Sequence, residues 1–147
     1  MISEASPVGA STLQRTYEFQ ERPAHDVLLD PSFPYREELL QFIWEQGLFD
    51  RHGLRTVDGE MVEVVHAGTI QANSGPDLVD ATVRIGGQLW AGTVEVHVRA
   101  SEWYAHGHHT DPAYDNVVLH AVWVHDMDVR TSGGGRPPAV VLKDRND

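Results

Sequence analysis

The sequence predicts an α/β domain of the α+β kind, in which one helix precedes three strands, a short helix and a further strand. Three observations carry this expectation. Residues 35–49 have apolar side chains at helical spacing, and residues 78–98 alternate between apolar and polar side chains around Gly86-Gly87. Residues 114–124 form a nearly continuous apolar run, which is typical of a strand buried on both faces.

The first part of the chain divides into a leader and a helix. Residues 1–33 are rich in Ser, Pro, Glu and Ala, so we expect a flexible leader, and residues 34–147 are expected to form one domain. Pro34 marks the start of the predicted helix, and glutamates in its first turn favour the positive end of the helix dipole.

The strands follow in order. Asp58-Gly59 predicts a turn between short extended pieces at 54–57 and 61–66. Residues 67–77 are expected to form a loop that leads into the next strand.

A hairpin and a short helix come next. Gly86-Gly87 predicts a two-residue turn between strands 78–85 and 88–98. Ser101 is a candidate N-cap for a short helix. A last short strand is expected at 140–142, after a loop rich in Gly and Pro.

Composition excludes several classes of protein. The chain has no cysteine, so a metal would need His, Asp or Glu as ligands. No apolar run approaches the ~20 residues of a membrane helix, and the first residues do not form a secretory signal, so we expect a cytoplasmic bacterial protein without a membrane partner. The net charge of -11 argues against a freestanding nucleic-acid binder.

Asp77, Glu95 and His97 are the first candidate site. Glu95 and His97 are two residues apart on a predicted strand, so they point to the same face. The hairpin brings Asp77 toward that face, which makes a seat for a divalent metal and an activated water. The alternative is that Asp77 caps a loop and that Glu95 lies on a solvated sheet face.

The residues that follow this strand form a second constellation. The cluster of His106, His108, His109 and Asp111 offers ligands for zinc, manganese or nickel, although an exposed polar loop explains the same residues. Glu45, on the first predicted helix, is a further accessory candidate, with solvent exposure as the alternative.

Two resemblances rest on these residues. Gly75-Pro76-Asp77 followed by Glu95-x-His97 resembles the PD-(D/E)XK nuclease pattern, with His97 where that superfamily usually has lysine. The resemblance implies a mixed central sheet flanked by helices, with the site on the second and third strands. Residues of roughly 34–143 are also similar to a bacterial family of unknown function whose members are usually longer, so the chain resembles their N-terminal portion or a short relative.

The nuclease resemblance implies a metal-dependent nuclease that hydrolyses phosphodiester bonds. Asp77 and Glu95 would hold Mg²⁺ or Mn²⁺, with Zn²⁺ as the alternative metal, and His97 would position or deprotonate the attacking water. Nucleic acid would be the partner, together with a protein partner or a missing C-terminal region. The alternatives are a catalytically degenerate scaffold domain of the same fold, and a His-rich metal-binding protein or metalloenzyme centred on His97, His106 and His108.

Overall fold

The computed structural model describes residues 32–72 and 75–145. The expectation of a flexible leader at 1–33 therefore lies outside the described residues, apart from its last two positions. Phe33 is buried, and its ring lies 5.0 Å from that of Trp123, whose indole Nε1 donates a 2.8 Å hydrogen bond to Ser32 Oγ. Ser32 and Phe33 thus belong to the packed domain.

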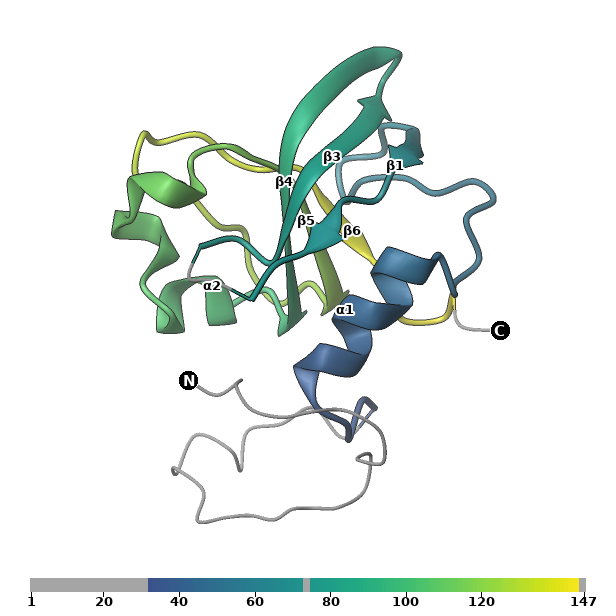
Figure 1. Cartoon of the computed structure of the whole chain (residues 1–147), viewed down its shortest axis with the longest axis horizontal. Helices are drawn as coiled ribbons and strands as arrows, with labels where there is room; N and C mark the ends of the chain where they lie inside the picture. The colour runs from purple at the N-terminus through teal and green to yellow at the C-terminus, as the bar shows by residue number, and fades with distance from the viewer. Residues whose placement is uncertain (1–31, 73–74, 146–147) are drawn as a thin grey trace.

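A single mixed sheet forms the centre of the structure (Figure 1). Its strand order is β1-β3-β4-β5-β6, with the short β2 paired to β3. The bounds are β1 Val62–His66, β2 Thr69–Ile70, β3 Leu78–Ile85, β4 Gln88–Arg99, β5 Val117–Val124 and β6 Ala139–Val141. The pairs from β1 to β4 are antiparallel, whereas β4, β5 and β6 run parallel. The fold is therefore α+β with a mixed sheet.

Helices lie on both sides of β4. Helix α1 (Glu37–Gln46) buries Leu40 and Trp44 in a core that includes Val94 and Val96 of β4. The crossover from β4 to β5 contains α2 (Glu102–Ala105) and the 3₁₀ turns η3 (His108–Thr110) and η4 (Pro112–Tyr114), and it contributes Trp103 to a separate apolar cluster. Val94 and Val96 lie on the face of β4 that packs in the core with α1. Because neighbouring residues of a strand face opposite ways, Glu95 and His97 point toward the crossover.

The predicted hairpin is confirmed. Ile85 pairs with Gln88, and Gly86 and Gly87 have φ values of 58° and 87°, which residues other than glycine rarely adopt. Other expectations need correction. Residues 54–57 form only the isolated bridge between Arg55 and Met61, and the loop expected at 67–77 contains β2.

None of the helices within residues 32–72 and 75–145 is long and apolar enough to cross a membrane.

Gly92 allows β4 and β5 to approach closely beside the candidate site. A Cβ at this position would lie 2.6 Å from both the Asn116 carbonyl oxygen and Val118 Cγ1. We expect Gly92→Ala to lower the free energy of unfolding by about 1–3 kcal/mol, as overpacking does in other cores. The measurement is urea unfolding followed by circular dichroism. Gly133→Ala is the control, because its Cβ would meet only an ordinary 3.5 Å contact with Asp115; equal stability of the two variants would contradict the prediction.

Candidate metal centre

The candidate centre lies where the start of β3 meets the middle of β4. The Asp77 backbone N–H donates to Glu95 Oε1 at 3.0 Å, and the Val96 backbone N–H donates to Asp77 Oδ2 at 2.9 Å. Each carboxylate therefore accepts a hydrogen bond from the backbone beside the other carboxylate.

Asp80, with a left-handed φ of 61°, lies at the irregularity between Leu78 and Ala81 in the pairing of β3 with β4.

His97 lies at the middle of a group of buried polar side chains. Its side chain is fully buried, and Nε2 lies 3.3 Å from Glu95 Oε2 and 3.9 Å from Glu37 Oε2. Neither His97 Nε2 nor Glu37 Oε2 has a hydrogen-bond partner within the described part of the chain. His108 Nε2 lies 3.0 Å from the same Oε2 atom of Glu95. Two imidazole nitrogens thus converge on one carboxylate oxygen, with a second carboxylate close by.

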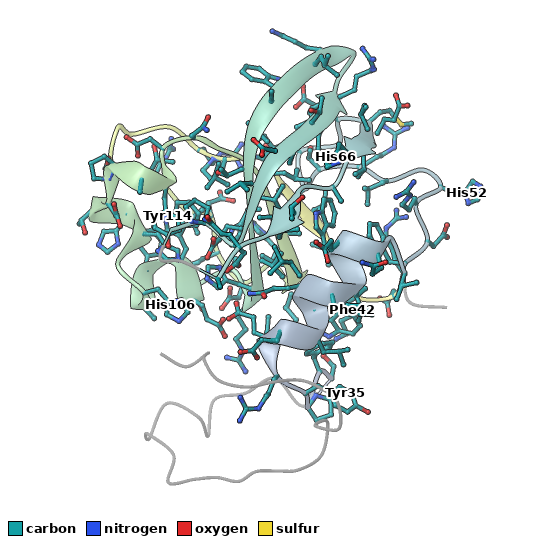
Figure 2. All side chains as sticks on the ribbon, in the orientation of Figure 1. Tyr35, Phe42, His52, His66, His106 and Tyr114 are labelled. Atoms are coloured by element: carbon teal, nitrogen blue, oxygen red, sulfur yellow. The ribbon has the colours of Figure 1, made fainter. Side chains whose placement is uncertain are left out.

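Two further residues extend this group. The ligand nitrogens of His97, His106 and His108 all lie within 4.8 Å of one another, and so do ligand atoms of Glu37, His97 and Glu102. His106 is exposed and lies beside α2 (Figure 2). The Glu37 side chain keeps 18% of its surface accessible. The open side of the centre therefore lies between the start of α1 and the segment after α2.

Burial disfavours charge on the buried carboxyl and imidazole groups of the centre. It raises the pKa of Glu95 to about 8, and burial together with the nearby Glu95 charge raises the pKa of Asp77 well above its usual range. Burial also raises the pKa of Glu37, with the Asp77 charge adding to the effect. The pKa of His97 falls well below its usual value, and that of His108 falls to about 4, because burial favours the neutral rings. Neutral imidazole is the form that binds metals, and a cation would offset the carboxylate charges.

The structure brings together five of the eight residues that the sequence suggested for the site. Asp77, Glu95 and His97 meet as described, and His106 and His108 join them from the crossover. The crossover from β4 to β5 is short, so its histidines stay close to β4. The ring centroids of His97 and His106 lie 5.1 Å apart.

The structure places the three other accessory candidates in contacts outside this group of residues. Glu45 Oε2 accepts a 3.1 Å hydrogen bond from the Ile70 backbone and so ties α1 to β2. It lies eight residues after Glu37, which places it about 12 Å further along the helix. His109 packs against the Tyr104 ring at 4.9 Å, and Asp111 caps η4 through the Ala113 backbone N–H at 3.0 Å.

Glu37 and Glu102 were not among the site residues expected from the sequence, and neither was the contact of His97 with His120. A signal for Glu37 does exist in the sequence. Leu40 and Trp44 follow Glu37 by three and seven residues, so Glu37 shares a helix face with these two buried side chains. A glutamate on the buried face of a helix is a candidate for a site, because an unpaired buried charge is costly.

Fold and side chains together define a mixed α+β protein with a buried His/Glu cluster that could hold a metal ion. The chain belongs to the family described as "Protein of unknown function (DUF2851)", whose model matches residues 37–147. No curated protein and no solved structure matches the chain.

Proposed function

We propose that this protein binds a divalent transition metal and uses it to hydrolyse phosphodiester bonds of nucleic acid. The observation that carries the metal site is His97 Nε2, a fully buried nitrogen that has no hydrogen-bond partner among the described residues and faces two carboxylates. A buried polar atom without a partner is costly. A bound cation would give this nitrogen its missing partner and would neutralise the carboxylates.

The donor set fits Zn²⁺ or Mn²⁺ better than Mg²⁺. His97, Glu95 and His108 would be the inner ligands, because Nε2 of each histidine lies within 3.3 Å of Glu95 Oε2. Imidazole nitrogen suits zinc and related transition metals, whereas Mg²⁺ prefers oxygen ligands and water. His106 and Glu37 lie at the open side, where they can complete the coordination or contact a substrate.

A divalent ion held this way lowers the pKa of bound water and offsets negative charge on phosphate. The remaining roles belong to the protein. Glu37 is the candidate proton acceptor, since its buried Oε2 has no hydrogen-bond partner within the described residues, its carboxyl has a raised pKa and its side chain as a whole keeps 18% of its surface accessible. Asp77 is the candidate positioning residue, because its backbone N–H holds Glu95 Oε1.

The choice of phosphodiester substrates rests on the resemblance to the PD-(D/E)XK pattern. Pro76-Asp77 precedes β3, and Glu95-x-His97 lies on the adjacent β4. The order α1, β1, β3, β4, α2, β5 fits the element order expected for that superfamily, with β2 as an addition. In this reading Glu37 is the carboxylate that the first helix adds to the site.

A metal-binding domain without catalysis is the second candidate function. The closure of the centre favours it, because His97 and Glu95 are only 0% and 3% exposed. A substrate phosphate would have to approach from the side of Glu37 and His106. The two functions share the metal site and differ in turnover, so one assay separates them.

Glu37→Gln tests catalysis separately from metal binding. With Mn²⁺ or Zn²⁺ present, we expect the wild-type protein to nick supercoiled plasmid, and we expect Glu37→Gln to be slower by about 100-fold or more, as for loss of a general base. Calorimetry should show that metal affinity changes much less than the rate. Glu45→Gln is the matched control, since it lies on the same helix outside the centre.

Equal nicking by wild type and Glu37→Gln would contradict the assigned role of Glu37. Metal binding without any cleavage of DNA or RNA would favour the second candidate function.

A further inference from the structure

We propose that His120 is a positioning residue that holds His97 in the tautomer able to bind metal, an inference that rests on the proposed metal site. His97 Nδ1 lies 2.8 Å from His120 Nε2. Both residues are fully buried, so the pair is shielded from water. The contact joins β4 to the neighbouring parallel strand β5.

The short distance requires one proton between the two rings. Two protonated nitrogens at 2.8 Å would repel each other, and so would two lone pairs, so one nitrogen donates and the other accepts. Each neutral imidazole carries one proton. The direction of this hydrogen bond therefore decides which nitrogen of His97 keeps a free lone pair.

Metal binding selects one of the two directions. If His97 Nδ1 donates to His120, His97 Nε2 carries a lone pair that faces Glu95 Oε2 and Glu37 Oε2. In the opposite direction, the proton of His97 would lie on Nε2 and would occupy the position of the metal. Ligating histidines commonly donate their second N–H to an outer partner, which fixes the ring orientation. Here the outer partner is another imidazole.

The surroundings of His120 hold its ring in place. Its ring centroid lies 5.2 Å from that of Trp103, which is itself fully buried and donates from Nε1 to the Arg130 carbonyl oxygen at 2.9 Å. His120 Nδ1 has no hydrogen-bond partner among the described residues. Within those residues, the remaining polar contact of the His120 side chain is therefore the one with His97. Holding the His97 ring in position explains why a histidine occupies this buried place.

The test compares two substitutions at position 120 by calorimetry with Zn²⁺. His120→Leu removes the acceptor, and we expect Zn²⁺ to bind about 10–100-fold more weakly, the usual effect of losing an outer-shell partner. His120→Gln offers an amide oxygen to His97 Nδ1 and should restore most of the affinity. Val122→Ala is the control for lost packing, because Val122 is also fully buried on β5 but its side chain cannot form a hydrogen bond with His97.

Long-range ¹H–¹⁵N correlation spectra of the Zn²⁺-loaded wild-type protein supply a readout that does not depend on any variant folding. We expect protons on Nδ1 of both His97 and His120, with His97 Nε2 bound to zinc. A proton on His120 Nε2 in the zinc-loaded protein, or wild-type affinity in a folded His120→Leu variant, would overturn the role of His120 and leave the metal centre intact. Absence of Zn²⁺ binding by the wild-type protein would instead overturn the centre itself, and this inference with it.

Discussion

His97→Ala is expected to weaken binding of Zn²⁺ or Mn²⁺ by at least about 100-fold. The substitution removes a candidate inner ligand, and outer-shell partners alone are commonly worth 10–100-fold. Calorimetric titration of metal-free protein measures the effect directly. His109→Ala is the matched control, because His109 belongs to the same histidine-rich segment but packs on Tyr104 outside the centre. Wild-type affinity in His97→Ala, with the fold intact by circular dichroism, would contradict the assignment.

His97→Lys distinguishes two ways of holding the metal. In the PD-(D/E)XK pattern, lysine occupies the position of His97, so a centre built only on Asp77 and Glu95 should tolerate the change and keep its metal. In the proposed metal centre, His97 Nε2 would be an inner ligand, because it lies 3.3 Å from Glu95 Oε2, which His108 Nε2 also approaches to 3.0 Å. We therefore expect His97→Lys to lose metal affinity much as His97→Ala does.

The metal-free protein is expected to lose stability as pH rises from about 7.5 to 8.5. The pKa of Glu95 is about 8 in the fold and near 4.5 in the unfolded chain, so the folded state binds more protons across this interval and the free energy of unfolding falls with pH. For Glu95 alone, the fall between pH 6.5 and 8 is about 1–2 kcal/mol. Asp77 and Glu37, whose pKa values are also raised, act in the same direction.

The buried histidines have the opposite effect at lower pH. Burial lowers the pKa of His120 to about 3 and that of His108 to about 4. Below about pH 6.5 these histidines therefore bind more protons in the unfolded chain, and their contribution to stability rises with pH. At pH 6.5 the unfolded histidines are still half protonated, so they partly offset the decline from the carboxyl groups up to about pH 7.5. The carboxyl decline stands alone above about pH 7.5, and this is the interval in which it should be measured.

Bound metal should remove this decline. Metal at 100 times its dissociation constant adds about 2.7 kcal/mol of stability, and it binds the deprotonated carboxylate, so the gain should increase toward pH 8. Urea unfolding at pH 7.5, 8 and 8.5, with EDTA or with Zn²⁺, measures both trends. Glu95→Gln in EDTA is the control and should show a weaker pH dependence. Stability in EDTA that stays constant or rises over this interval would show that Glu95 is not held neutral in the fold.

Local patterns in the sequence predict the centre of this fold well. The glycine pair at the hairpin and the alternation around it place β3 and β4 within a residue of their observed bounds. The spacing of two residues between Glu95 and His97 places them on one face, as observed. These features follow from the geometry of one strand and one turn, which neighbouring residues determine.

Features that depend on how elements meet could not be predicted in the same way. Helical periodicity places Glu37 on the face of α1 with Leu40 and Trp44, but it does not show which part of the sheet that face meets. The contact of His97 with His120 depends on the register of two parallel strands, and the sequence of each strand does not determine that register. β2 has only two residues, which is too short to show any alternation.

Crystals soaked in Mn²⁺ or Zn²⁺ and measured at wavelengths on either side of the metal absorption edge test the metal centre most directly. We predict one anomalous peak about 2.0–2.2 Å from His97 Nε2, within coordination distance of Glu95 and His108. A fully occupied peak among other residues, or no peak in crystals that show the cluster well ordered, would contradict the account.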